Sequence, residues 1–330
     1  MDSIVYPSWL KTELEEVNNH IERLCHSNNE TMQRMMEWIL KARGKQIRPV
    51  LTLLCSKLKE KRVDATEMAA VIEVCHTASL VHDDIIDNAD VRRGQLSVQK
   101  KFGKEMAVYA GDFMIFSTIR RTGLKNKPWY GMMFEKLEAM CDGEVRQFEN
   151  RFNTEITEEK YIDNIVGKTS AMFSIACCAG AYEGKCNKEE IKAIEEFSKK
   201  FGIVFQLRDD LMDFITTEGI SGKTTHSDFK SGYYTLPAIY TFEHSQYGDE
   251  LKNIAKKIRS GNERGIFDKK IEELVCISGG LGYTINKIDY YAKEAKASLD
   301  VFQDSEVKKC LIELVEMLCI NVHSLFKESL

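Results

Sequence analysis

Proline is scarce in this sequence, with only four residues in a chain of 330. Because proline breaks helices, its scarcity favours long, uninterrupted helices. The strict alternation of apolar and polar residues that is typical of strands nowhere extends beyond about five residues. No stretch rich in proline, glycine or serine divides the chain. We therefore predict an all-α protein of about a dozen helices, folded as a single domain over residues 1–330.

A basic excess is also missing, since 46 Lys and Arg stand against 51 Asp and Glu, a net charge of −5. A general nucleic-acid surface needs the opposite balance, so nucleic acid is not an expected partner. The N-terminus lacks a basic start followed by an apolar core, and no apolar run reaches the roughly 18 residues of a membrane span. The sequence therefore predicts neither a secretory signal nor stable membrane insertion.

The ten cysteines include no C-x-x-C pair, which argues against a metal-binding or redox motif. The one adjacent pair, Cys177–Cys178, lies in the apolar run SAMFSIACCAGA. Scattered cysteines in apolar surroundings are typical of small buried side chains in a reducing compartment. We therefore expect free thiols and a cytoplasmic protein.

Capping signals predict where helices begin. Asp64 with Glu67 and Asn187 with Glu190 both have the capping-box spacing. The main irregular stretch is Thr216–Tyr234, which is rich in Thr, Ser and Gly. A loop of this length in a compact fold is more often functional than idle, and we expect it to cover a bound ligand.

Two D-D-x-x-D motifs, each at the end of an apolar helical stretch, are the main chemical signal. The first consists of Asp83, Asp84 and Asp87, and the second of Asp209, Asp210 and Asp213. Residues four apart share a helix face, so the carboxylates of each motif repel one another unless a cation neutralises them. Oxygen ligands suit Mg²⁺, above all when phosphates share the coordination. A solvated acidic face would explain one motif alone, but it explains two equivalent motifs poorly.

Basic residues surround the two motifs in the sequence, as a bound diphosphate would require. Arg92 and Arg93 follow the first motif, and Lys45 and Arg48 stand at an expected helix entrance. The segment GKTSAMF places Lys168 beside Thr169 at what we predict to be another helix start, and Lys223 lies in the long loop. Lys, Arg and the N–H groups of a helix start together bind diphosphates, although each residue alone is a weak signal.

With these motifs in order, the chain resembles the trans-isoprenyl diphosphate synthases of the polyprenyl synthetase family, and in particular bacterial medium- and long-chain members. The segments that carry the resemblance are GKQIRP, HTASLVHDDIIDNADVRRG, GDF, GEVRQ, GKTSAMF, FQLRDDLMDF and SDFKSGYYTLP, spanning Gly44 to Pro237. The resemblance implies a single bundle of long helices around a deep central cavity, usually in a dimer.

The resemblance also implies roles for individual residues. Asp83, Asp87 and Asp209 match metal ligands, with Asp84, Asp210 and Asp213 completing the motifs, and the implied cofactor is Mg²⁺, about three ions per active site. The residues that match an isopentenyl diphosphate site are Lys45, Arg48, His76 and Arg93. The residues that match an allylic diphosphate site are Arg92, Lys168, Thr169, Gln206 and Lys223.

The implied reaction joins isopentenyl diphosphate to an allylic diphosphate such as farnesyl diphosphate. Metal and basic residues draw charge from the allylic diphosphate, which leaves, and the double bond of isopentenyl diphosphate attacks the allylic cation. The departing diphosphate takes the proton, so no protein nucleophile is needed. Three positions depart from the family pattern: Tyr233 replaces a common lysine, Leu96 a proline, and Gln99 a frequent histidine.

Three other functions remain open at this stage. A farnesyl or geranylgeranyl diphosphate synthase would make a shorter product with the same motifs. A class I terpene cyclase also uses an aspartate-rich motif with Mg²⁺, but it needs no isopentenyl site such as Lys45 and Arg48. A non-catalytic subunit of a two-chain prenyl synthase usually loses its acidic motifs, and this chain keeps both.

Product length is predicted from the helix that ends in the first motif. One helical turn rises about 5.4 Å, roughly the length of one extended isoprene unit. Ser79 lies one turn before Asp83 and Cys75 lies two turns before it, while Ala78 is adjacent and Phe116 is a candidate floor on the facing helix. Because these upstream residues are small, we expect a medium-to-long product of about six to eight units.

Overall fold

The computed structural model describes residues 6–59, 63–122, 127, 129–215, 227–261 and 266–329, with the backbone alone at Thr122 and at 321–329. The chain forms two compact units. Unit 1 comprises Met1–Phe134, Ser174–Glu195 and Val301–Leu311. Unit 2 comprises Glu135–Phe173, Glu196–Asp300 and Ile312–Leu330.

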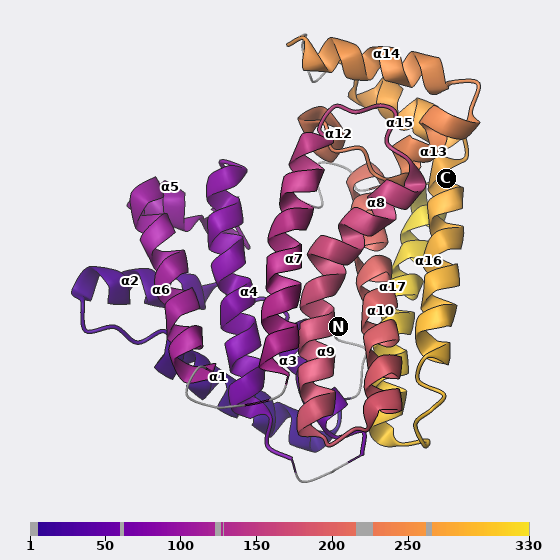
Figure 1. The fold of residues 1–330 in the computed structure, drawn as a ribbon. Helices are drawn as coiled ribbons and strands as arrows, with labels where there is room; N and C mark the ends of the chain where they lie inside the picture. Colours follow the sequence, from indigo (N-terminus) through magenta and orange to yellow (C-terminus); the bar gives the residue numbers. More distant parts are fainter. Residues whose placement is uncertain are drawn as a thin grey trace. The chain divides into compact units, whose positions relative to one another are not determined.

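The prediction of an all-α protein is confirmed (Figure 1). Helices that lie within unit 1 are α1 Ser8–Leu24, α2 Glu30–Lys41, α3 Ile47–Ser56, α4 Thr66–Ile86, α5 Val98–Phe102 and α6 Lys104–Thr122. Helices within unit 2 are α8 Glu158–Ile165, the π-helix η1 Val166–Ser170, α12 Ser227–Ser231, α13 Leu236–His244, α14 Gly248–Arg259, α15 Asp268–Ile277 and α16 Gly280–Ala297. Helices with residues in both units are α7 Tyr130–Glu149, α9 Ala171–Glu183, α10 Lys188–Ile215 and α17 Glu306–Ser329.

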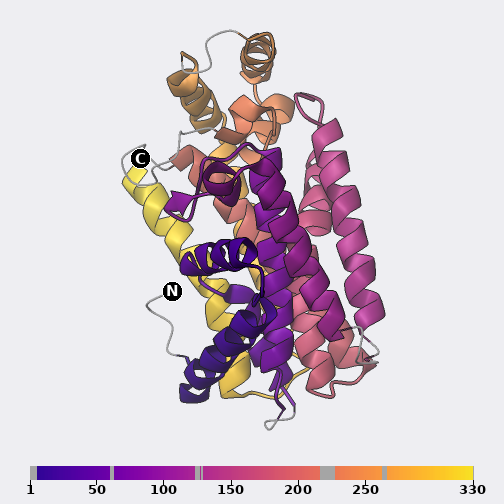
Figure 2. The same ribbon diagram turned by 90° about the vertical axis from the view of Figure 1, so that its left-hand side faces the viewer.

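Helix α4 is the centre of unit 1, where α1, α3 and α6 pack against it. Figure 1 shows α4 and α6 side by side, and Figure 2 shows α1 and α2, the two indigo helices, on the side that faces the viewer. The approach of α4 and α6 is close at Gly111, where an added Cβ would lie 2.2 Å from Nε2 of His82. This packing fixes the C-terminal end of α4, which carries the first acidic motif.

In unit 2, α7 and η1 approach closely through two glycines. A Cβ built on Gly143 would lie 3.4 Å from the carbonyl carbon of Gly167. On the other side of η1, a Cβ on Gly202 of α10 would lie 2.5 Å from Oγ of Ser170. The expected helix start at GKTSAMF is therefore wrong, because these residues form a π-turn inside a continuous helix from Glu158 to Glu183. Such π-turns are frequent at functional sites.

Of the two predicted capping boxes, one is confirmed. Asn187 Oδ1 accepts a bond from the Glu190 amide at 2.9 Å, and Glu190 Oε2 accepts from the Asn187 amide at 2.6 Å. The box at Asp64 is wrong, because the Asp64 carboxylate instead accepts bonds from the amide and hydroxyl of Thr66, where α4 begins. Residues 216–226 of the predicted loop lie outside the described residues, and 227–231 form α12.

All ten cysteines are free thiols, as expected. The continuous helix Glu158–Glu183 has a mean hydropathy of 1.2 over its most apolar window, long and apolar enough to span a membrane by composition alone. However, 72% of that window is buried inside the protein, which is typical of a core helix.

Candidate active site

The first acidic motif lies where α4 ends, and its three carboxylates differ in exposure. Asp83 is half-buried, Asp87 is exposed at the helix C-cap, and Asp84 is buried with 2% of its surface exposed. The Asp87 amide donates to the Asp83 carbonyl at 2.8 Å, which continues the last helical turn. Asp83 and Asp87 are therefore one helical turn apart, on the same face of α4.

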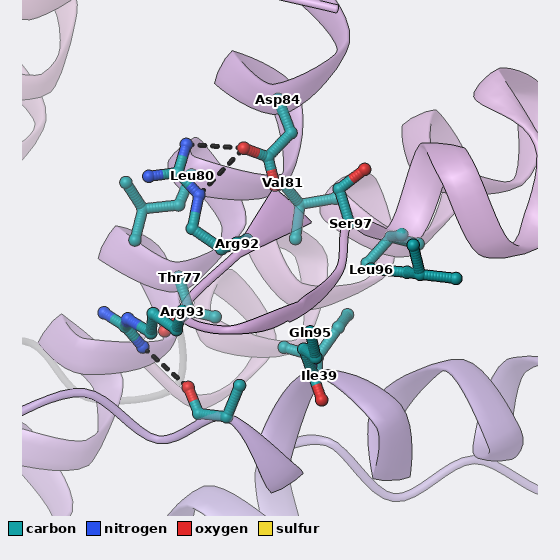
Figure 3. Close-up of a pocket in the computed structure, with 12 residues that line it drawn as sticks. Ile39, Thr77, Leu80, Val81, Asp84, Arg92, Arg93, Gln95, Leu96 and Ser97 are labelled. Atoms are coloured by element: carbon teal, nitrogen blue, oxygen red, sulfur yellow. Dashed lines mark hydrogen bonds and ion pairs between the residues drawn. The ribbon is translucent and has the colours of Figure 1, made fainter. Parts of the chain in front are cut away.

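Asp84 is held by Arg92, whose Nε and Nη2 both donate to Oδ1 of Asp84, at 2.8 and 2.5 Å (Figure 3). Arg92 is placed by a small hairpin in which Val91–Arg92 (β1) pair with Gln95–Leu96 (β2). The two residues of the turn, Arg93 and Gly94, both have positive φ, as a type I′ turn requires. The R-R-G sequence is therefore a turn motif as well as a source of charge.

Gln99, one of the departures from the family pattern, secures the chain after the motif. Its side-chain amide donates to the carbonyl of Asp84 at 2.7 Å and to that of Ala89 at 2.9 Å. Ser97 Oγ also donates to the Ala89 carbonyl, at 2.6 Å. The Asp84 carbonyl, in the last turn of α4, also accepts from the Ala89 amide at 2.9 Å, and Ala89 itself lies just beyond the helix end. Gln99 thus supplies a structural contact at this position.

A basic cluster lies beside the hairpin in unit 1. Arg48 at the start of α3 contacts His76 of α4, with Nη1 and Nε2 separated by 2.9 Å. Burial lowers the pKa of His76 well below its usual range, and Arg48, Arg93 and Arg92 lower it further. A neutral His76 accepts from Arg48 through Nε2, so the ring proton resides on Nδ1. Lys45 is exposed just before α3.

Arg93 completes this cluster by bridging to the loop before α3. Its Nη1 donates to the Ala42 carbonyl at 3.0 Å (Figure 3), and its guanidinium packs on Gly44, where a Cβ would lie 2.6 Å away. Burial lowers the pKa of Arg48 to about 10, with Glu73 opposing this effect and Arg93 adding to it. The cavity beneath the hairpin has a volume of about 30 Å³, enough for a water molecule or two.

The second acidic motif, on α10 in unit 2, repeats the division seen in the first. Asp209 is exposed over 47% of its side chain and contacts Arg208 at 3.2 Å. Asp210 is 4% exposed, accepts a bond from the Tyr161 hydroxyl, and accepts another from Gln206 Nε2 at 2.6 Å. Burial raises the pKa of Asp210 to about 8, and Asp228 contributes to the increase.

Asp213, the third residue of that motif, caps the short helix α12. Its carboxylate accepts bonds from the amide and hydroxyl of Ser227, at 3.3 and 3.2 Å, and from the Asp228 amide at 3.3 Å. The motif therefore holds Ser227 and Asp228, the first described residues after 216–226, next to the end of α10. Lys223, predicted to bind the allylic diphosphate, falls among those residues and lies outside the described part of the chain.

The structure places the remaining predicted residues of unit 2 around the π-turn. Lys168 Nζ donates to Glu144 at 2.9 Å and to Gln147 at 3.2 Å, both on α7. Thr169 Oγ1 donates to Gln206 Oε1 at 2.7 Å, which leaves the Gln206 amide to bind Asp210. A chain of hydrogen bonds thus links the GKTS segment to the second acidic motif.

The chemistry of the donor set suits a hard divalent cation. Asp83 and Asp87 offer carboxylate oxygens from one face of α4, and Asp209 offers another from α10, whereas Asp84 and Asp210 are already bonded inside their units. Within the described residues, no three His, Cys, Asp or Glu side chains converge closely enough to hold a metal by themselves. One or two carboxylates are what Mg²⁺ commonly takes from a protein when water and phosphate oxygens complete its coordination.

Comparison with known proteins agrees with these motifs. The polyprenyl synthetase family model matches residues 29–274, three-quarters of the chain. The chain belongs to the polyprenyl synthetase family. It is 31% identical to octaprenyl diphosphate synthase of Escherichia coli K12 over 304 residues, which cover 91% of this chain and 93% of that protein. It is 30% identical over 308 residues to a short chain isoprenyl diphosphate synthase of Methanothermobacter thermautotrophicus, covering 92% and 94%.

A solved polyprenyl synthase has the same fold as this chain. The Caulobacter crescentus polyprenyl synthase complexed with calcium and isoprenyl diphosphate superposes with a TM-score of 0.86 at 25% identity, covering 94% of this chain and 95% of that one. The family and these relatives make the present chain a trans-prenyltransferase that uses prenyl diphosphates.

The positions expected to control product length in this synthetase lie in different surroundings. Ala78 is fully buried, whereas Ser79 is half-buried and its hydroxyl donates to the His76 carbonyl at 2.8 Å. Cys75 Sγ contacts Thr118 Oγ1 of α6 at 3.3 Å. Phe116, the candidate floor, is 64% exposed. Cys75 and Ser79 therefore share a face of α4, while Ala78 packs into the core of unit 1.

Sequence reasoning missed two buried residues of the site. Glu73 lies one turn before His76 on α4 and is 7% exposed; burial raises the pKa of Glu73, and Arg48 and Arg93 oppose the increase. Tyr161 of α8 holds Asp210. The i, i+3 spacing of Glu73 and His76 could have indicated the first residue, but no local signal in the sequence points from Tyr161 to Asp210.

Proposed function

We propose that this chain is a Mg²⁺-dependent synthase that condenses isopentenyl diphosphate with an allylic primer such as farnesyl diphosphate to make a medium-to-long all-trans polyprenyl diphosphate. The observation that carries the proposal is the matched division of the two acidic motifs. In each, the second aspartate is buried on its own partner, while the first is less buried, Asp83 being half-buried and Asp209 exposed over 47% of its side chain. A purely structural acidic helix end would need no such repetition.

The expected binding roles follow from these positions. Asp83, Asp87 and Asp209 would hold the metal, which supplies neutralisation of the diphosphate charge when bound. We assign the isopentenyl diphosphate to the cluster around Arg48, where a neutral His76 orients the guanidinium by accepting from Nη1. His76 then acts as a positioning residue rather than a base, since its lowered pKa makes the ring a poor proton acceptor.

On the allylic side, Arg92, Lys168, Thr169 and Gln206 are the residues we assign to the leaving diphosphate. The C–O bond of the primer breaks and its electron pair leaves with the diphosphate, while the double bond of isopentenyl diphosphate forms the new C–C bond. The departing diphosphate accepts the proton. Arg92 and Lys168 must exchange their present carboxylate partners, Asp84 and Glu144, for phosphate oxygens in order to contribute.

We propose a product of about six to eight isoprene units, because Ser79 and Cys75 are small residues on one face of α4. The named products of relatives support both longer and shorter chains, since octaprenyl and short chain synthases are about equally similar. The proposed product length therefore depends on the face of α4 that carries Ser79 and Cys75.

We also propose that the two units work as one catalytic domain in a homodimer. Exposed side chains at Cys141, Val145 and Phe148 of α7 have the 4,3 spacing of one helix face. On α6, Tyr109, Phe116 and Ile119 are likewise exposed. Exposed apolar stripes of this kind are typical of interfaces between subunits.

The proposal is tested with the purified chain, Mg²⁺, farnesyl diphosphate and labelled isopentenyl diphosphate. We expect an all-trans prenyl diphosphate longer than the primer, and none when a chelator removes the metal. A hydrocarbon product would indicate a terpene cyclase instead. No product from any allylic primer would contradict the proposal and favour the role of a non-catalytic subunit.

A further inference from the structure

Tyr233 stands where many members of the family carry a lysine, and an arginine from another segment lies over its ring. The Arg151 guanidinium carbon is 5.2 Å from the centre of the Tyr233 ring, and the rings of Phe148 and Phe152 lie 5.6 and 5.5 Å away. All four residues belong to unit 2. Three aromatic faces around one guanidinium stabilise a positive charge at this place.

The backbone holds this arginine in position. Nε and Nη2 of Arg151 donate to the carbonyl of Ser231, at 3.0 and 2.8 Å. The Phe152 amide donates to the Gly232 carbonyl at 2.8 Å, and a Cβ on Gly232 would lie 2.7 Å from the Phe152 ring. Gly232 also has a φ of +85°, so any other residue would be strained there. The segment after α7 is therefore fixed against the segment after α12.

The same arrangement places Arg151 close to the second acidic motif. Ser231 ends α12, and Asp213 caps the beginning of that helix. A helix of five residues is about 7.5 Å long. Arg151 and the acidic motif therefore hold opposite ends of one short helix, at a separation that a bound diphosphate and its metal could bridge.

The charge of Arg151 is not compensated by a nearby acid among the residues that the structure describes. Its contacts there are the Ser231 carbonyl and the three rings, and none is a carboxylate. The Nη1 group takes no part in the bonds to Ser231. A half-buried guanidinium with three of its five N–H donors to spare, two of them on Nη1, suits a phosphate oxygen, which arginine binds well.

We propose that Arg151 binds the diphosphate of the allylic substrate. It takes the role of the lysine that other family members have at the position of Tyr233, and the Tyr233 ring packs against its guanidinium. This assignment rests on the proposed function and extends it to a residue outside the family motifs. The competing explanation is that Arg151 only stabilises the C-terminal end of α12, where a cation is favoured.

The test measures binding of farnesyl diphosphate by calorimetry with Mg²⁺, without isopentenyl diphosphate, together with KM for both substrates. Arg151→Gln keeps a donor for Ser231 but removes the charge. We expect its affinity for farnesyl diphosphate to fall about tenfold or more, as for a lost charge-assisted hydrogen bond, while KM for isopentenyl diphosphate changes less than about twofold. Arg151→Lys should lose less than Arg151→Gln, because the charge remains.

The double variant Arg151→Gln with Tyr233→Lys decides between the two explanations. Restored affinity would support a shared role in binding, since lysine at 233 cannot bond to the Ser231 carbonyl in the same way. Arg259→Gln is the matched control, because Arg259 also lies near the Phe152 ring, at 5.9 Å, and is exposed; it should leave the affinity unchanged.

Two results would overturn the assignment. If Arg151→Gln binds farnesyl diphosphate as the wild type does, Arg151 is not a ligand of the diphosphate. If that variant loses affinity and folds normally but Tyr233→Lys restores nothing, the charge does not act at the position of the missing lysine. A wild type that binds neither substrate would contradict the proposed function itself, a result distinct from both.

Discussion

At the scale of single residues, the two aspartates that begin the motifs differ from the two that follow them. Asp84 and Asp210 are buried on Arg92 and on Tyr161 with Gln206, so they hold the ends of their helices in place. The first aspartates are less buried, since Asp83 is half-buried and Asp209 is exposed over 47% of its side chain. Identical residue types in one motif thus serve different purposes because their tertiary partners differ.

The α4 face predicts how product length responds to substitution. Ser79→Phe should shorten the product to about three isoprene units, because a bulky ring one turn from Asp83 leaves room for about one turn of chain. Phe116→Ala is the control and should give an equal or longer product, since Phe116 is exposed rather than packed across α4. Chromatography of the dephosphorylated products measures both, and a wild-type product from Ser79→Phe would show that the chain does not pass this face.

The buried His76 predicts a dependence of stability on acid. Its pKa lies well below 6.5 in the folded protein, chiefly through burial and then through Arg48, Arg93 and Arg92. As pH falls through 6.5, His76 becomes protonated in the unfolded chain but stays neutral in the folded protein. The free energy of unfolding therefore decreases. The free-energy difference between wild type and His76→Gln should therefore shrink from pH 7.5 to pH 5 in denaturant titrations. A constant difference across that range would contradict a neutral, buried histidine.

At the scale of elements, helix contacts are set by small residues at particular crossings. Gly111 lets α6 approach His82 of α4, and Gly143 and Gly167 let α7 approach η1. The hairpin β1–β2 then directs Arg92 back onto α4. These contacts, rather than helix propensity, determine where the functional side chains stand.

The crossing of α4 and α6 is tested by Gly111→Ala. An added Cβ would lie 2.2 Å from His82 Nε2, so the ring must move away from its contacts with Val108 and Asp112. We expect a destabilisation of about 1–3 kcal/mol in denaturant unfolding, as for an overpacked site. Gly131→Ala on α7 is the matched control, since a Cβ there meets no atom within 4 Å, and it should be neutral or stabilising. Equal stability of the two variants would contradict a close crossing.

Many of the helices and their starting residues could be predicted from the sequence, and the exceptions have physical causes. Asn187 and Glu190 bond to each other locally, so their spacing was sufficient to place the start of α10. Asp64 also acts locally, but it bonds to Thr66 rather than to Glu67, and spacing cannot distinguish the two. The π-turn at Val166–Ser170 arises in a helix that crosses its neighbours closely, and the hairpin strands are too short to alternate.

At the scale of the whole molecule, the all-α fold followed from the scarcity of proline and the lack of strand alternation, and the family assignment followed from the order of the motifs along the chain. The burial of Asp84 and Asp210 did not, because it depends on Arg92 and on Tyr161, and Tyr161 lies far from its partner in sequence. The same is true of Arg151 and Tyr233, which no motif connects. Long-range partners are the information that a single sequence lacks.

The exposed face of α7 predicts assembly. Val145→Glu places a charge on the stripe formed with Cys141 and Phe148, and Val145 is 59% exposed in the single chain. We expect this variant to shift a homodimer toward monomer in sedimentation at micromolar concentration, because burying an unpaired charge is costly. Glu135→Gln, also exposed on α7 but away from the face of Cys141, Val145 and Phe148, is the control. A monomeric wild type would contradict the dimer.

The central proposal is that both acidic motifs are needed for the same reaction. The most direct measurement is turnover of Asp83→Ala, Asp209→Ala and the double variant at saturating Mg²⁺, with thermal unfolding to confirm the fold. We predict that each single variant loses several orders of magnitude in turnover, and that the double variant is hardly worse than either, because residues acting as a unit are not additive. Near-normal turnover of either single variant would contradict the account.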